Sequence, residues 1–210
     1  MFKKVLSILA SSIISGILIA IGGIIFLSCE SKYLGALFFA VGLFFICEGG
    51  FKLYTGAIGY ALDNKLEDNL MLIVITIGNF IGTLLISLII KLTRISNNIL
   101  EKDLATVDTK LNDTWYSILV LAIMCGIMIY LGVNTFKKST NYVSKVVAIF
   151  ICVFVFIISG FEHCVANMFY ISLANAWNIK SILYMLIMIL GNSIGGLLIP
   201  LLSKLIEVKK

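Results

Sequence analysis

A short polar stretch interrupts one of the apolar segments of the chain. Residues 160–168 read Gly-Phe-Glu-His-Cys-Val-Ala-Asn-Met, inside an apolar run from Val146 to Leu173. That run is long enough to cross a bilayer, which takes about 20 apolar residues in a helix. Glu162 supplies a carboxylate, and His163 supplies the only imidazole of the protein. Ionisable groups at membrane depth are costly and indicate a functional site by default. Such a cluster can also hold transmembrane helices together, and these residues alone leave both interpretations open.

The other reactive side chains do not converge on His163. The five cysteines have no CxxC spacing and lie mostly in apolar segments, which is typical of packing residues rather than metal ligands or disulfide partners. All five aspartates fall in polar segments, so no Ser-His-Asp or metal set can be assembled beside the imidazole. Adjacent helical residues point about 100° apart, so Glu162 and His163 are not expected to share a face. We therefore expect no metal and no cofactor. A membrane-embedded enzyme or a structural subunit remains an alternative to a transport protein.

Composition places the chain in a membrane. Hydrophobic residues make up 60% of it, charged residues 13%, and the mean hydropathy is +1.10. Soluble domains average about 45–50% apolar and 25% charged residues. The lysines cluster at the ends of apolar segments, so the net charge of +5 requires no nucleic-acid partner. The first apolar run continues to about Ser28, which is too long for a signal-peptide core and indicates a retained helix.

The hydropathy pattern predicts an all-α protein with six membrane helices. Expected spans cover about residues 5–28, 33–62, 70–90, 115–135, 146–173 and 182–202. The second span is interrupted at residues 48–56 by glycines and by Glu48 and Lys52. Non-helical backbone at this depth is tolerated where protein buries it or where it lines a cavity. Glu48 and Lys52 are four residues apart, so we expect them to pair, or Glu48 to cap a neighbouring backbone. Residues 63–69 are expected to form a loop, and residues 91–114 a surface helix or loop.

The two halves of the chain resemble each other. Three pairs of segments match in order, at offsets of 110, 110 and 113 residues. They are Gly16–Gly22 with Gly126–Gly132, Gly50–Lys52 with Gly160–Glu162, and Gly78–Gly82 with Gly191–Gly195. Each half holds three spans, an odd number, so the halves cross the membrane in opposite senses. We expect a single transmembrane channel domain, residues 1–210, with inverted repeats at about 1–91 and 111–210 linked by the polar segment 91–114.

Inverted repeats with paired broken helices are a transport architecture, in which the site lies where the breaks meet. The aquaporin plan follows the same logic but needs two Asn-Pro-Ala turns, and Pro200, the only proline, lies outside both breaks. Lysine and arginine residues are more numerous on the side of the membrane where both termini are expected than on the other side. The positive-inside rule therefore predicts cytoplasmic termini in a multi-pass protein of the cell membrane.

These motifs resemble those of the formate/nitrite transporter family. Ser159-Gly160 followed by Phe161–Met168 is similar to the signature of its fifth helix, and Leu53-Tyr54-Thr55-Gly56 to the loop in its second helix. The two Gly-Asn-x-Ile-Gly elements fit its third and sixth helices. The resemblance implies a homopentamer in the lipid bilayer with one pore per protomer. It also implies a small anion, such as hydrosulfide, formate or nitrite, as substrate.

The resemblance also implies roles for individual residues. His163 corresponds to the central pore histidine, Thr55 to the threonine that faces it, and Lys110 to a lysine in the vestibule. Leu53 and Tyr54 close one end of the pore. Apolar constrictions fall at Leu43, Phe156 and Phe39. The polar side chains of the two interrupted segments, rather than the resemblance, indicate supporting positions at Glu162, Asn167, Lys52 and Glu48. Two departures from the family, Lys52 beside the loop and Cys125 where formate and nitrite members often carry asparagine, favour hydrosulfide.

An anion that enters a narrow apolar pore loses its hydration at a cost of several kcal/mol or more. A lysine at the mouth, such as Lys110, raises the local anion concentration. His163 can offer the anion a hydrogen bond or, if charged, a proton, and a protonated weak acid passes an apolar constriction as a neutral species. Without the resemblance, Phe156 and Leu43 would be packing residues. The residues themselves indicate that Asn79, Asn192 and Asn167 are hydrogen-bond partners between helices.

Overall fold

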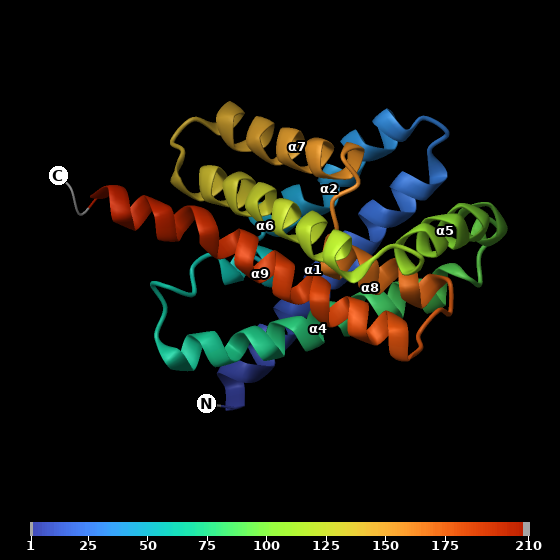
Figure 1. Ribbon diagram of the computed structural model, residues 1–210, viewed down its shortest axis with the longest axis horizontal. Helices are drawn as coiled ribbons and strands as arrows, with labels where there is room; N and C mark the ends of the chain where they lie inside the picture. Colours follow the sequence, from blue (N-terminus) through green and yellow to red (C-terminus); the bar gives the residue numbers. More distant parts are fainter. Residues whose placement is uncertain (1, 208–210) are drawn as a thin grey trace.

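A computed structural model describes residues 2–207, which form an all-α bundle (Figure 1). The predicted all-α class is confirmed. The helices of the described range are α1 (Phe2–Ser28), α2 (Lys32–Glu48), α3 (Tyr54–Ile58), α4 (Leu66–Ile90), α5 (Ser96–Leu111), α6 (Trp115–Lys138), α7 (Tyr142–Ile158), α8 (Cys164–Leu173) and α9 (Ile179–Glu207). Helix α5 lies at the end of the bundle away from both termini.

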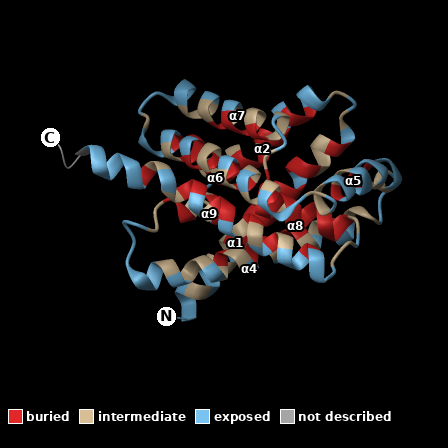
Figure 2. Ribbon diagram, in the orientation of Figure 1, coloured by how far each residue is buried: buried red, intermediate tan, exposed pale blue. Residues whose placement is uncertain are grey.

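Four helices are long and apolar enough to cross a membrane: α1, α4, α6 and α9. Helices α7 and α8 are apolar but shorter. Large apolar side chains such as Phe38, Ile73 and Leu186 are exposed on the outward helix faces, while the buried residues gather where the helices meet (Figure 2). Extended apolar surface of this kind marks a membrane or protein interface. Together with the apolar helices it identifies a membrane protein.

The long helices pack in two pairs, α1 with α4 and α6 with α9. Both contacts depend on glycine. A methyl group on Gly16 would overlap the carbonyl of Asn79, and one on Gly126 would overlap the carbonyl of Asn192. Small residues allow membrane helices to approach closely where no hydrophobic effect drives them together. The glycine-rich segments that match between the two halves of the sequence therefore lie at corresponding helix contacts.

Two of the apolar segments are not continuous helices. Helix α2 ends at Glu48 and α3 begins at Tyr54, while α7 ends at Ile158 and α8 begins at Cys164. Each intervening turn contains a glycine with positive φ: Gly50 at +66° and Gly160 at +71°. Glycine adopts this left-handed conformation without the steric cost that a side chain would bring. The interruptions lie where the sequence predicts them.

The predicted ion pair between Glu48 and Lys52 is wrong. Because α2 ends at Glu48, Lys52 lies in the non-helical turn rather than one helical turn later. Both side chains are exposed, and the ion pairs among residues 2–207 do not include either of them. The loop expected at residues 63–69 is shorter than predicted, because α4 already begins at Leu66. The polar segment 91–114 was expected to form a surface helix or a loop, and it contains the surface helix α5.

Candidate functional site

A buried asparagine holds the turn before α3. Asn79, on α4, accepts a hydrogen bond at its Oδ1 from the Tyr54 N–H at 2.9 Å. Its Nδ2 donates to the carbonyl oxygens of Ser12, at 2.8 Å, and Lys52, at 3.0 Å. Backbone groups released from helices at membrane depth need such partners. One amide side chain therefore ties α1, α4 and the start of α3 together.

Asn192, on α9, makes the corresponding set in the other half. Its Oδ1 accepts from the Cys164 N–H at 2.9 Å, and its Nδ2 donates to the carbonyls of Ala122 and Glu162, both at 2.8 Å. Asn79 and Asn192 are both fully buried. Their predicted role as hydrogen-bond partners between helices is confirmed. Each also positions the residues just before a helix, which the sequence does not reveal.

His163 is the N-cap of α8 and meets Thr55 from α3. The imidazole Nδ1 accepts a hydrogen bond from the Ala166 N–H at 3.1 Å. Its Nε2 lies 2.8 Å from the hydroxyl oxygen of Thr55. Both side chains are buried, at 2% and 1% exposure. Because Nδ1 is an acceptor, the proton of the neutral ring is on Nε2, and Nε2 donates to Thr55.

This arrangement favours a neutral imidazole. An imidazolium has N–H groups at both nitrogens, so it would lose the bond from Ala166 to Nδ1. Thr55 accepts from the ring, so its own hydroxyl hydrogen remains available for a further acceptor. The His163–Thr55 pair can therefore offer hydrogen bonds to a passing group without carrying a charge.

Aromatic rings cover one side of the imidazole. The Phe156 ring stacks near His163, with centroids 5.8 Å apart at 29° between planes. Phe39 meets Phe156 edge to face at 6.1 Å. Both phenylalanines are buried. The polar atoms of His163 thus lie beside an apolar wall built from α2 and α7.

The second polar group of the site is an ion pair. Lys110, in the last turn of α5, lies 2.7 Å from Glu162 Oε2 through its Nζ. Asn167 Nδ2 donates to the same oxygen at 2.7 Å. The Glu162 side chain is 4% exposed and that of Lys110 is 16% exposed. A buried charge requires such pairing. Glu162 points to Lys110 and Asn167, while His163 points to Thr55, in agreement with the expectation that they do not share a face.

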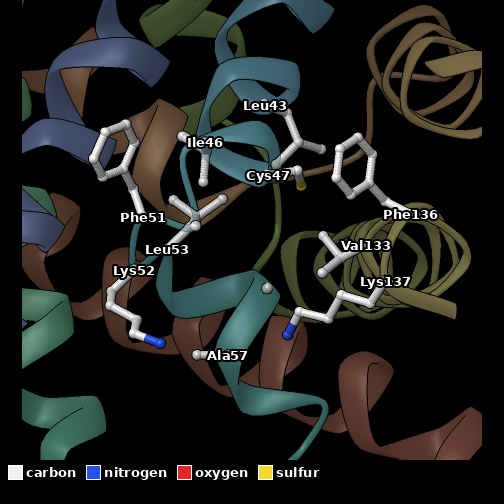
Figure 3. A pocket seen from close by; sticks show the side chains of 12 residues that line it. Leu43, Ile46, Cys47, Phe51, Lys52, Leu53, Ala57, Val133, Phe136 and Lys137 are labelled. Carbon is white, nitrogen blue, oxygen red and sulfur yellow. The ribbon is translucent and has the colours of Figure 1, made fainter. Parts of the chain in front are cut away.

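Two cavities flank the His163–Thr55 pair. The α5-side cavity has a volume of about 280 Å³ and is lined by residues that include Phe39, Lys110, Phe156, Glu162, His163 and Tyr170. The α3-side cavity has a volume of about 100 Å³ and is lined by residues that include Leu43, Cys47, Lys52, Leu53, Phe136 and Lys137 (Figure 3). His163 borders the first cavity. Thr55 is not among the residues that line either cavity, but Leu53 and Gly56, close to it in sequence, both border the second.

The structure distributes the predicted constriction residues differently from the expectation. Leu43 was expected beside Phe156, but it lines the α3-side cavity with Leu53. The physical reason is its place on α2, one helical turn beyond Phe39, which lines the other cavity. Tyr54 is not among the residues that line either cavity, and its hydroxyl bonds to Ser193 Oγ at 2.7 Å.

Sequence reasoning did not single out three residues that border the α3-side cavity, nor the buried Asp103, which lines neither cavity. Lys137 and Phe136 look like an ordinary helix end, because lysines commonly terminate membrane spans. In the sequence, Cys47 looks like one more packing cysteine. All five cysteines are free thiols. Asp103, on α5, is fully buried, and neither of its oxygens has a hydrogen-bond partner among the described residues. Burial raises the pKa of this carboxyl to about 8, while Lys91 and Lys110 lower it in part.

Comparison with known proteins identifies the family. The family model described as "Formate/nitrite transporter" matches residues 1–206. The chain therefore belongs to the formate/nitrite transporter family. This confirms the family to which the motifs around His163 and Thr55 point. Its members are transporters rather than enzymes, which agrees with the predicted class.

Individual relatives match parts of the chain. The formate channel FocA of Haemophilus influenzae is 30% identical over 151 residues, which are 67% of this chain and 53% of that protein. The uncharacterised transporter YrhG of Bacillus subtilis is 31% identical over 155 residues, 69% of this chain and 58% of that protein. The chain thus spans little more than half the length of these relatives.

A solved structure shares the fold over nearly the whole chain. It is described as a pentameric formate channel with formate bound, and it matches with a TM-score of 0.83 at 23% identity. The match covers 98% of each chain. The helical arrangement of Figure 1 is therefore that of a known channel fold.

Proposed function

We propose that the protein passes small monovalent anions of weak acids across a membrane, with His163 and Thr55 at the centre of the path. The observation that carries this proposal is their 2.8 Å hydrogen bond, which joins His163 at the α5-side cavity to Thr55 beside the residues of the α3-side cavity. A hydrogen-bond pair between apolar walls supplies some compensation for lost hydration without holding the anion tightly. Conduction requires that balance, because an ion must be able both to enter and to leave.

The neutral imidazole suggests how the central step works. An anion that has passed the Phe39–Phe156 wall or the Leu43–Leu53 wall accepts a hydrogen bond from the Thr55 hydroxyl, and one from His163 Nε2–H when this group releases Thr55. Transfer of a proton from His163 to each anion is the alternative. The bond from Ala166 to Nδ1 favours the neutral donor, because it is lost when the ring is doubly protonated.

We propose formate as the first substrate to test and hydrosulfide as the second. A relative and a structural neighbour are both described as formate channels. The hydrosulfide preference expected from Lys52 and Cys125 stays a prediction. Cys125 is fully buried and is not among the residues that line either cavity, whereas Lys52 lines the α3-side cavity. Nitrite is the third candidate.

The assembly and topology are part of the proposal. We infer a homopentamer in which each protomer holds a separate path, because the structural neighbour is described as pentameric. Two inverted halves, residues 1–91 and 111–210, would form one channel domain in the cell membrane with both termini in the cytoplasm. The matching roles of Asn79 and Asn192 support the repeat. Residue 1 and residues 208–210, at the ends of this domain, lie outside the described residues.

Flux through the purified protein in liposomes tests the function. Formate, hydrosulfide, nitrite and chloride are supplied in turn at equal concentration, and protein-free liposomes provide the background. We expect formate and hydrosulfide to exceed background and chloride not to do so. Equal background rates for all four anions would contradict the function, and hydrosulfide flux far above formate flux would reverse the order of substrates.

A further inference from the structure

The turns before α3 and α8 carry opposite charges at corresponding positions. Lys52 follows a Gly-Phe dipeptide in the first turn, and Glu162 follows one in the second. The backbone carbonyl of each accepts a hydrogen bond from the Nδ2 of the corresponding asparagine. The charge of Glu162 is balanced by Lys110 at 2.7 Å. The Lys52 ammonium group has no carboxylate partner in residues 2–207.

A second lysine faces Lys52. Lys137, in the last turn of α6, also lines the α3-side cavity. Its Nζ lies 3.8 Å from the centre of the Tyr60 ring, a contact that orients the ammonium group and leaves its charge in place. Figure 3 shows the two side chains extending toward each other from opposite sides, beside Ala57. Within the described range, no ion pair neutralises either of them.

The rest of this cavity is uncharged. Leu43, Leu53, Ile46 and Phe136 form apolar walls, and no acidic side chain is among the lining residues of this described pocket. Two ammonium groups that face each other repel, and an anion between them replaces that repulsion with attraction. The small volume of the cavity, about 100 Å³, restricts the anion to a few heavy atoms.

We propose that Lys52 and Lys137 form a binding site for a small carboxylate-sized monovalent anion at the mouth of the α3-side cavity. The site collects the anion before it meets the apolar pair Leu43 and Leu53. It rests on the proposed function in that the same anion then moves on to the His163–Thr55 pair. The α5-side cavity lacks two facing lysines of this kind, because Lys110 pairs with Glu162 and Lys32 donates to the Ile158 carbonyl.

Cys47 lines the same cavity and provides a direct probe of the site. Iodoacetate is a small carboxylate, and iodoacetamide is its neutral counterpart of similar size. Both alkylate the same thiolate, so the ratio of their rates at Cys47 reports the attraction for the anion and cancels the ionised fraction of the thiol. The rates are measured on the intact protein in detergent, with peptide-level mass spectrometry to separate Cys47 from Cys29.

We expect Lys52→Met/Lys137→Met to lower the iodoacetate-to-iodoacetamide ratio at Cys47 by about fivefold or more, the factor for one close charge pair in water. Formate should slow iodoacetate in the wild type more than chloride does at equal ionic strength. Lys138→Met is the matched control, because it removes a neighbouring charge of α6 that is not among the cavity-lining residues. It should leave the ratio at Cys47 unchanged, and the ratio at Cys29 should not respond to any of the variants.

Two results would overturn the site. One is an equal ratio in the wild type and the double variant. The other is formate that slows the reaction of iodoacetate at wild-type Cys47 no more than chloride does. The measurement is independent of transport. A lysine-dependent ratio in a protein that shows no flux would retain the site and remove the channel function, whereas flux with a lysine-independent ratio would do the reverse.

Discussion

The two cavities are built by the same device and carry different charges. On each side an asparagine from a long helix holds a glycine-containing turn, and a short helix begins at the turn's end. On the α5 side the turn presents Glu162, which neutralises Lys110 inside a larger cavity. On the α3 side it presents Lys52, which lies opposite a second cation, Lys137. The repeated framework thus sets positions, while single side chains decide the electrostatics of each mouth.

The caps of the two short helices differ in the same way. His163 caps α8 with its own side chain, whereas Leu53, the residue before α3, makes no side-chain cap. The α8 turn therefore contributes a polar group to the centre, and the α3 turn contributes an apolar wall with Thr55 two residues later. His163 from one half and Thr55 from the other meet in a hydrogen bond.

The largest expected effect tests whether the two asparagines are equivalent. Asn79→Leu leaves the Tyr54 N–H and the Lys52 carbonyl without partners, and Asn192→Leu leaves the Cys164 N–H and the Glu162 carbonyl without partners. At about 1–3 kcal/mol for each group, either change should prevent a stable fold. Size-exclusion chromatography and thermal unfolding in detergent measure this. Asn97→Leu, at an exposed position of α5, is the control and should elute as the wild type.

A difference between the two asparagine variants would modify the comparison. If Asn79→Leu gave a stable protein and Asn192→Leu did not, the α3 turn would be held by other contacts. The two turns would then share their backbone arrangement but not the contacts that stabilise it.

The second-largest expected effect compares the stability contribution of Lys110, which pairs with Glu162, with that of Lys52, which forms no ion pair within residues 2–207. Lys110→Met leaves the Glu162 charge buried, so we expect a loss of about 3–5 kcal/mol in unfolding free energy. Lys110→Met/Glu162→Gln removes both charges and should regain most of it. Lys52→Met should change stability by less than about 0.5 kcal/mol, because its side chain is exposed. Thermal unfolding of the three variants is the measurement. A stable Lys110→Met single variant would show that the ion pair is unimportant.

Asp103 predicts a dependence of stability on pH that belongs to the α5 side. Its folded pKa, about 8, exceeds the value of 3.8 for a free carboxyl, because burial disfavours the charge. The folded state therefore keeps a proton that the unfolded state loses. Its stabilising effect is complete below about pH 4 and declines as the pH rises through 8. Lys91 and Lys110 oppose the shift, and Tyr170 lies near the carboxyl.

Asp103→Asn should remove this dependence. We expect the variant to gain thermal stability over the wild type by several degrees at pH 8 and by much less at pH 5. Asp108→Asn, at an exposed position of the same helix, is the control. A difference between variant and wild type that does not vary with pH would mean that Asp103 is charged in the folded protein.

The smallest effect concerns entry from the α3 side. Lys52→Met/Lys137→Met should raise the formate concentration for half-maximal flux by about fivefold and leave the maximal rate unchanged, because only the local anion concentration falls. High salt should reduce the difference, since it screens the lysines. Initial rates in liposomes across a range of formate concentrations measure both quantities. A lower maximal rate with an unchanged half-maximal concentration would place the lysines in the translocation step.

Much of this arrangement follows from glycines, charges and asparagines inside apolar runs. They indicated both interruptions and the hydrogen bonds of Asn79 and Asn192. His163 and Thr55 came from the resemblance of their motifs to a family. The role of Lys137 could not be predicted, because its significance depends on the distant Lys52. Asp103 lies in a polar segment, where burial has no signature in sequence. The predicted Glu48–Lys52 pair is wrong because the sequence does not show that α2 ends at Glu48. Without a helix between the two residues, a spacing of four no longer brings their side chains together.

The central claim is that the neutral His163 side chain acts as a hydrogen-bond donor at the middle of the path. The direct measurement is formate flux in liposomes between pH 5 and 8 for the wild type, His163→Asn and His163→Phe, each checked for assembly. Asparagine can cap α8 through its Oδ1 and still donate through its Nδ2. We expect His163→Asn to keep most of the flux and the wild-type pH profile, and His163→Phe to lose about tenfold or more. Loss of flux and of pH dependence in His163→Asn would favour proton exchange, and wild-type flux in His163→Phe would contradict the central role of this residue.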